Sequence, residues 1–298
     1  MALGSSTDLS LEVRADARPA RLRLQLPRTG WIAGSGILLL LGLTGVAIQI
    51  VPSWRHLYLA QNLGQTFLPP LSHGHILGTD NLGRDMLWRL VGGLGVSLGI
   101  GVSVSVLSIV LGLAAGVFSA FFGRAADVCS NVVIDVTWAF PAVLLAVVFA
   151  GIFGPSLITV VLALAVTGWA SFARIVRGEV LSLREREFVA AARVLGVPRV
   201  AIGVRHLVRN LIPVTIVLSV FFISTSIIGE AGLSFIGLGV QDPTPSLGLI
   251  LSEARQYVTV TWWPVLLAGG LLVVVVFYLN SLGDHLRDRF DPHRHGQR

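Results

Sequence analysis

Long apolar stretches, separated by short polar segments, constrain this chain more than any other feature. Most are close to the roughly 20 residues that an α-helix needs to cross the hydrocarbon core of a bilayer, and the second is too long for one upright helix. The chain is 54% hydrophobic and only 13% charged, whereas a soluble globular domain carries about 25% charged residues. We therefore expect an all-α polytopic membrane protein with six transmembrane helices, at residues 31–51, 90–122, 131–153, 156–173, 211–229 and 264–283.

Arginine supplies all 22 basic residues, and its distribution predicts the orientation of the helices. Six crossings place both termini on one side of the membrane, and that side carries 18 of the 22 arginines. Because cytoplasmic segments are enriched in basic residues, we expect both termini and the 174–210 segment to be cytoplasmic. The chain then divides into a cytoplasmic tail at 1–30, a first helix at 31–51, an external segment at 52–89, a five-helix core at 90–283 and a cytoplasmic tail at 284–298.

The lack of lysine excludes several chemistries. A Walker A phosphate loop requires a lysine, so we do not expect this chain to hydrolyse ATP by that route. The His73/His75 and His293/His295 pairs have no third ligand nearby in the sequence, so they do not indicate a zinc site. No nucleophile–base arrangement stands out either. The chain is therefore predicted not to be an enzyme and to carry no cofactor of its own.

The segment 174–212 predicts two short amphipathic helices joined by a tight turn. Phe188, Ala191, Ala192 and Leu195 have the i, i+3, i+4, i+7 spacing of one helix face. Gly196 suits the left-handed residue that ends a helix, and a proline two residues later suits the first turn of the next one. Two interpretations remain open. The hairpin lies on the lipid surface, or its apolar face docks into a groove of a cytoplasmic partner.

Four stretches, in this order, give the chain a family resemblance. They are LGTDNLGRD at 77–85, FVAAARVLGVPRVAIGVRHLVRNLIP at 188–213, GLSFIGLGVQDPTPSLG at 232–248 and NSLGDHLRDRFDP at 280–292. Together they resemble the C-type permease subunit of binding-protein-dependent dipeptide and oligopeptide ABC importers. The resemblance implies a bacterial inner-membrane permease for short peptides. It also implies a paralogous permease, two ATPase subunits that carry ATP and Mg²⁺, and an extracytoplasmic binding protein as partners.

In that family, the segment matching 188–213 is a coupling helix that sits in a groove of the ATPase subunit. The resemblance implies that the ATPase-facing residues are Glu185, Glu187, Phe188, Ala190, Ala191, Ala192, Leu195, Gly196 and Arg199. Position 190 is Ala where the family signature has Glu. Any carboxylate contact with the ATPase is then expected from Glu185 or Glu187. Relatives also move nickel chelates, and a secondary transporter driven by an ion gradient is the alternative class of function.

The third apolar stretch carries the first candidate pathway residues. An ionisable side chain inside a span usually faces protein or water, and a proline in a helix interior is expected to kink it. The candidate gate residues are Asp135, Trp138, Phe140 and Pro141. Two interpretations remain open: these residues line a cavity or gate, or Asp135 forms a structural ion pair with Arg124 or Arg177.

The apolar segment 231–240 is too short to cross a membrane. We expect a re-entrant half-helix on the external side, within 231–248, because such backbone is tolerated where it is buried in protein or lines a cavity. Glu230, Ser234 and Phe235 are therefore candidate pathway residues. Glu230 either contacts substrate or caps the re-entrant turn.

The LGTDNLGRD stretch is expected to form an amphipathic helix that leads into the second span. Thr79 or Asp80 is the predicted N-cap. The pairs Asp80–Arg84 and Asp85–Arg89 have the i, i+4 spacing of helical ion pairs. A structural role is favoured over substrate contact.

Overall fold

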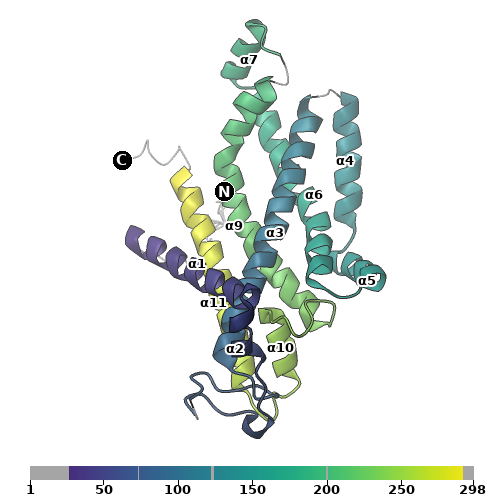
Figure 1. Cartoon of the computed structure of the whole chain (residues 1–298). Coiled ribbons are helices and arrows are strands. Elements are labelled where there is room, and N and C mark those ends of the chain that lie inside the picture. The colour runs from purple at the N-terminus through teal and green to yellow at the C-terminus, as the bar shows by residue number, and fades with distance from the viewer. Residues whose placement is uncertain (1–26, 73, 122–123, 199–200, 291–298) are drawn as a thin grey trace, which may run out of the picture.

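The computed structural model describes residues 27–72, 74–121, 124–198 and 201–290, and the chain there is helical with no β-strand (Figure 1). The long helices are α1 (Arg28–Ile50), α3 (Met86–Phe121), α4 (Arg124–Ala139), α5 (Ala142–Phe153), α6 (Leu157–Arg184), α9 (Val208–Phe235) and α11 (Trp263–Phe290). The shorter elements are η1 (Pro52–Trp54), α2 (His56–Leu59), η2 (Leu63–Gln65), α7 (Glu187–Val194), η3 (Ile202–Leu207) and α10 (Leu247–Arg255). The predicted all-α fold class is confirmed.

Five helices within the described ranges are long and apolar enough to cross a membrane: α1, α3, α6, α9 and α11. The predicted third span is not one helix. It is broken into α4 and α5, which meet at an angle of 80°. Pro141 causes the break, because proline donates no backbone hydrogen bond and forces the preceding residue out of the helical conformation. The expected kink is therefore a sharp bend, and six crossings result only if α4 and α5 form one span.

The predicted half-helix is also corrected by the structure. Residues 231–235 continue α9 without a break, and the separate short helix in this region is α10. Helix α9 ends where Gly237 takes a left-handed conformation, with φ of 83°. The Leu238 amide donates to the Leu233 carbonyl at 2.9 Å, as in a Schellman cap. The prediction was wrong because the sequence has no helix-ending signal before Gly237.

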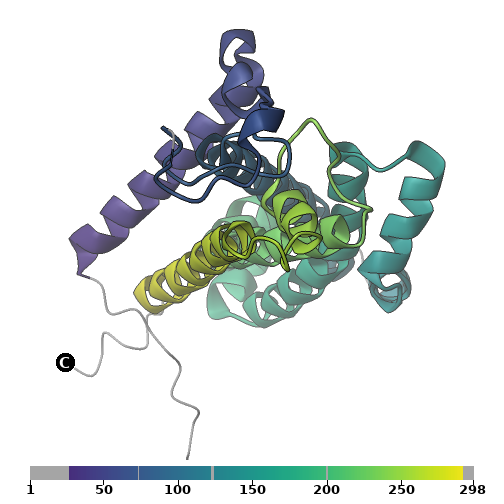
Figure 2. The same ribbon diagram turned by 90° about the horizontal axis from the view of Figure 1, so that it is seen from below.

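The helices pack closely through small residues. Helix α3 lies centrally, against α1, α6 and α9, and α1 and the α4–α5 pair flank the centre on opposite sides (Figure 2). A Cβ atom added to Gly112 of α3 would lie 2.7 Å from the Phe172 ring of α6. One added to Gly95 would lie 2.6 Å from the Gly45 carbonyl carbon of α1. Lipid chains are as apolar as the side chains, so van der Waals packing of this kind holds membrane helices together.

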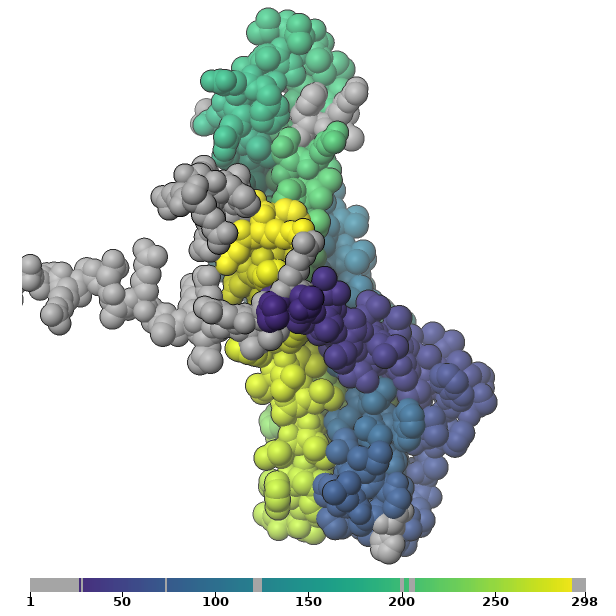
Figure 3. Space-filling model, turned by 90° about the vertical axis from the view of Figure 1, so that its left-hand side faces the viewer, coloured from purple at the N-terminus to yellow at the C-terminus, as the bar shows by residue number. Residues whose placement is uncertain are grey.

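The two ends of the molecule differ. Helix α7 projects as a narrow lobe at one end, and the 52–85 segment lies with α10 at the opposite end (Figures 1 and 3). Between them, α6 and α9 run the length of the bundle and lead towards α7. Of the predicted tails at 1–30 and 284–298, residues 1–26 and 291–298 lie outside the described residues. Residues 28–30 instead begin α1, and residues 284–290 extend α11 beyond its predicted end.

The glycine contact between α1 and α3 gives a first prediction. Gly95→Ala forces a methyl group into the α1 backbone, and such overpacking costs about 1–3 kcal/mol. We expect a lower melting temperature in detergent by scanning fluorimetry. Gly99→Ala, one turn along the same helix, is the control, because a Cβ there meets nothing within 4 Å. Equal melting temperatures for the two variants would contradict the packing described for α1.

Candidate translocation cleft and coupling segment

The bend between α4 and α5 opens a cleft of about 670 Å³ against α3, α6 and α9. Its lining is apolar with a few hydroxyl groups, and no charged residue is among the side chains that the structure assigns to it. The lining residues are Val104, Trp138, Phe140, Ala142, Leu164, Thr167, Gly168, Ser171, Ile175, Leu218, Phe221, Phe222, Thr225, Ser226 and Gly229. Below, "the cleft" means the space that these residues enclose.

The hydroxyl groups in the cleft already take part in hydrogen bonds within the protein. The Thr225 hydroxyl donates to the Phe221 carbonyl at 3.0 Å, and the Ser226 hydroxyl to the Phe222 carbonyl at 2.6 Å. On α6, Ser171 accepts a hydrogen bond from the Trp138 indole N–H at 3.1 Å. The cleft therefore presents weak acceptors and apolar surface. Such a surface suits passage, because conduction requires binding that is weak enough for the solute to leave.

The predicted gate residues divide between the cleft and its rim. Trp138 and Phe140 line the cleft, and Pro141 begins α5 at the bend. Asp135 forms an ion pair with Arg174 at 2.6 Å. The expected ion pair therefore exists, but its partner is neither Arg124 nor Arg177.

Arg177 makes a separate, bidentate ion pair with Asp127, at 2.7 and 2.8 Å. Helical spacing explains this choice of partners. Asp127 and Asp135 lie about two turns apart on α4, whereas Arg174 and Arg177 lie about one turn apart on α6. Each arginine therefore reaches a different carboxylate.

Glu230 lies away from the cleft and is completely buried. Its carboxylate accepts hydrogen bonds from Ser97 on α3 at 3.0 Å, from Ser234 at 2.7 Å and from Ser246 at 2.7 Å. Ser246 in turn accepts from the Leu249 amide and so caps α10. This cluster ties α3, α9 and α10 together, and neither Glu230 nor Ser234 is among the residues that line the cleft.

Phe235, the last predicted pathway residue, ends α9 and is also absent from the cleft lining. The Arg255 guanidinium lies over its ring at 4.1 Å. This stacking joins the end of α9 to the end of α10.

The LGTDNLGRD stretch is not the expected helix. Its two glycines, Gly78 and Gly83, have left-handed backbones with φ of 75° and 70°, which turn the chain tightly. Helix α3 starts only after Asp85, whose carboxylate accepts from the Leu87 amide at 2.9 Å. Asp85 is therefore the cap in place of Thr79 or Asp80.

The second expected i, i+4 pair is replaced by longer-range contacts. Asp85 pairs with His75 at 2.7 Å, and not with Arg89. The first pair is confirmed, since Arg84 contacts Asp80 at 2.6 Å.

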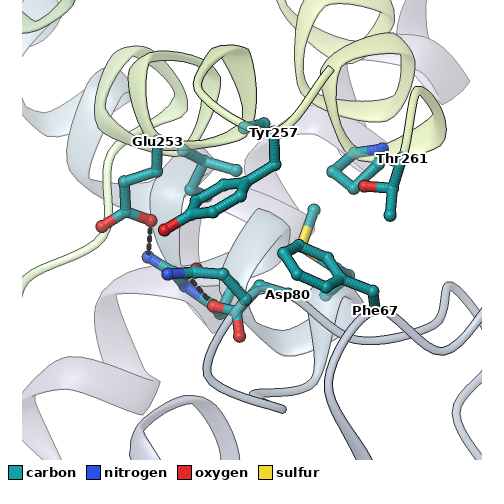
Figure 4. Close-up of a pocket in the computed structure, with 11 residues that line it drawn as sticks. Phe67, Asp80, Glu253, Tyr257 and Thr261 are labelled. Atoms are coloured by element: carbon teal, nitrogen blue, oxygen red, sulfur yellow. Dashed lines mark hydrogen bonds and ion pairs between the residues drawn. The ribbon is translucent and has the colours of Figure 1, made fainter. Parts of the chain in front are cut away.

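A buried ion-pair cluster joins this stretch to α10 and to the loop before it (Figure 4). Asp80 binds both Arg84 and Arg89, whose side chains are almost completely buried. Arg89 also donates to Glu253 at 2.8 Å, and Arg84 to Asp242 at 3.1 Å. Burial alone would raise the pKa of Asp80, but the charges of Arg89 and Arg84 outweigh it and lower the pKa below its usual range. Burial and the charge of Asp242 raise the pKa of Glu253, against the opposing effect of the arginines.

The 174–212 segment has the turn that was predicted at Gly196. Helix α7 ends in a Schellman motif: Gly196 has φ of 75°, its amide donates to the Arg193 carbonyl at 3.0 Å, and the Val197 amide donates to the Ala192 carbonyl at 3.1 Å. The following residues enter η3, a π-helix that leads directly into α9. Helices α6 and α9 are therefore linked through α7 by only a few residues.

The predicted docking face is partly wrong. Ala192 is buried with Val189 against α6 and the start of α9, so it faces the helical bundle of this chain. Val194 and Leu195 are instead 88% and 81% exposed, and together with Gly196 they form the α7 tip. Spacing alone did not show which face of α7 is buried, because Val189 and Ala192 have the same three-residue spacing as Phe188 and Ala191.

The other predicted coupling residues surround this tip. Glu185 follows the last turn of α6, and Glu187 begins α7. Phe188, Ala190 and Ala191 lie on the exposed side of α7. Arg199 lies outside the described residues.

Comparison with known protein families identifies the family to which this chain belongs. Residues 108–292 match the family described as the binding-protein-dependent transport system inner membrane component. The chain belongs to this family. It is thus a permease, the multi-pass inner-membrane component of an ABC importer, and members of this family are not catalytic subunits.

Several curated relatives cover most of the permease. It is 37% identical to the dipeptide transport system permease protein DppC of Alkalihalophilus pseudofirmus, over 73% of this chain and 72% of the relative. It is 34% identical to the oligopeptide transport system permease protein OppC of Bacillus subtilis, over 89% and 87%. It is 40% identical to the nickel transport system permease protein NikC of Escherichia coli K12, over 74% and 79%.

A solved structure shares the fold. The permease resembles a chain of the MetNI methionine ABC transporter in an inward-facing conformation, with a TM-score of 0.57 and 20% identity. The match covers 68% of the permease and 97% of that chain. At this identity the likeness shows the fold alone.

Two matched cysteine variants test the position of the cleft. In a Cys129→Ser background, which removes the exposed native cysteine, we expect Thr225→Cys to react readily with a water-soluble maleimide. Ser224→Cys should stay unreactive, because Ser224 is fully buried and faces α11. Mass spectrometry of the labelled permease in proteoliposomes gives both rates. Similar rates at the two positions would contradict the cleft.

The buried ion-pair cluster gives a stability prediction. Arg89→Met removes one of the two arginines that Asp80 and Glu253 share and leaves Arg84 alone between them. Removing one member of a buried pair costs about 3–5 kcal/mol. We expect a large drop in melting temperature by scanning fluorimetry. Arg255→Met removes only a stacking contact and serves as the control. A drop no larger than the control's would show that the cluster does not stabilise the fold.

Proposed function

We propose that this permease forms half of the translocation pathway for short peptides and couples it to ATP hydrolysis on partner subunits. The single observation that carries the proposal is the link from α7 to the cleft. The α7 tip lies between α6 and α9 in the chain, and these two helices supply 11 of the 15 residues that line the cleft. A movement imposed on α7 is therefore imposed on the cleft walls.

The tip has the character of a docking surface. Two large apolar side chains, Val194 and Leu195, are almost fully exposed at the end of α7. A partner can shift a conformational equilibrium only through contacts that differ between the two states. We assign those contacts to the α7 tip and to a groove on an ATPase subunit, where ATP and Mg²⁺ would bind.

The other partners follow from the same arrangement. The cleft is open along one side of a single chain, so a paralogous permease would supply the opposite wall. Both termini and α7 would face the cytoplasm, in agreement with the excess of arginine on that side. The opposite end, formed by α10 and the 52–85 segment, would then face the extracytoplasmic binding protein.

Peptides are the substrate class that most of these relatives suggest. The relatives named above include permeases of dipeptide and oligopeptide transport systems, together with one of a nickel transport system. An importer of a nickel chelate is therefore the second candidate. The family assignment leaves no support for the alternative of an ion-gradient-driven transporter.

Reconstitution of the permease with its partner subunits tests the proposal. We expect uptake of di- to oligopeptides that requires ATP and does not respond to an imposed proton or sodium gradient. Uptake of nickel chelates in place of peptides would favour the second candidate. Uptake driven by a gradient without ATPase subunits would overturn the proposed function.

One substitution tests the α7 tip directly. Leu195→Asp places a charge on the docking surface without disturbing the buried face of α7, so we expect at least a roughly tenfold loss of ATP-driven uptake, equivalent to about 1.4 kcal/mol. The amount of permease in the membrane should not change. Leu195→Met keeps the surface apolar and should retain uptake. Full activity of the Asp variant would contradict coupling through this tip.

A further inference from the structure

An ion pair between Asp135, in the predicted third span, and Arg174, directly after the predicted fourth span, stands out because it is exposed. The side chains of Asp135 and Arg174 are 67% and 46% exposed, although both belong to helices of the membrane-spanning bundle. Arg174 lies 10 residues before the end of α6, or about 15 Å along the helix. Charged groups at such positions are costly in lipid and normally face protein or a water-filled cavity.

The pair lies at the rim of the cleft. Arg174 stands on α6 between two lining residues, Ser171 and Ile175. Its guanidinium lies 4.5 Å from the ring centre of Trp138, which lines the cleft. Asp135 is on α4, nearly one turn before Trp138. The exposed charges therefore border a space whose described lining carries none.

We infer that Arg174 and Asp135 form a charge-recognition site for peptides in transit, and this inference rests on the proposed function. The guanidinium presents donors that match a peptide carboxylate, as arginine forks generally do. The carboxylate of Asp135 offers an acceptor for an ammonium group. Each side chain is held in place by the other and, for Arg174, by the Trp138 ring.

The neighbouring Asp127–Arg177 pair provides a matched comparison. It joins the same two helices with similar distances, but its side chains are only 29% and 25% exposed. A pair whose only role is to hold α4 against α6 would be expected to look like this one.

The ratio of uptake of an acidic to a basic peptide tests the inference. The assay uses the complete importer in proteoliposomes, with a peptide pair of equal length that carries either an aspartate or a lysine. Arg174→Gln leaves the negative charge of Asp135 alone at the rim, so the acidic-to-basic ratio should fall by roughly tenfold, the effect of about 1.4 kcal/mol. Asp135→Asn should raise the same ratio. A variant that assembles poorly would lower the uptake of both peptides equally, so the acidic-to-basic ratio would not change for that reason.

The controls separate the possible failures. Arg177→Gln should leave the ratio unchanged, and the near-isosteric Asp135→Asn variant keeps an oxygen acceptor for Arg174, so it preserves the packing. If both rim variants transport peptides with an unchanged ratio, the pair is structural or contacts the second permease, and the inference is overturned. If the unsubstituted importer takes up no peptide with ATP, the proposed function is overturned and the inference with it.

Discussion

The structure depends on one constraint: backbone polar groups inside a bilayer need partners within the protein. Five long helices meet this requirement internally. The α4–α5 bend does not meet it, because Pro141 interrupts the helical hydrogen bonds in the middle of the span that α4 and α5 would form together. Irregular backbone of this kind is tolerated where it borders a cavity. The bend and the cleft are therefore two aspects of the same feature.

Close packing allows this cleft to respond to events at one end of the molecule. Glycines on α3 bring its backbone close to the backbone of α1 and to the Phe172 ring of α6. At the opposite end, Glu230 and the Asp80 ion-pair cluster fix α10 against α3 and α9. Helix α9 is thus anchored at one end and, like α6, leads to α7 at the other. The cleft is lined by both helices.

Much of this fold could be predicted from sequence, since apolar runs of sufficient length specify membrane helices. The Gly196 turn was also predictable, because few other residues adopt a left-handed backbone easily. The LGTDNLGRD helix was wrong because that segment is shaped by tertiary contacts, with Arg89 between Asp80 and Glu253. The half-helix was wrong for a local reason, since α9 continues up to the left-handed turn at Gly237. The partner of Asp135 could not be assigned, since helical rotation selects Arg174 over Arg177. A sequence signal for the cleft did exist in the spacing of Leu164, Thr167, Gly168, Ser171 and Ile175 along one face of α6.

The central claim is that nucleotide-driven movement at α7 changes the width of the cleft. Spin labels at positions 140 and 225, on opposite sides of the cleft, measure that width by pulsed electron resonance in the assembled importer. The claim predicts that the distance distribution shifts when ATP is added to a hydrolysis-deficient ATPase partner, and that the shift is lost when the α7 tip carries a charge. An identical distribution with and without ATP would contradict it.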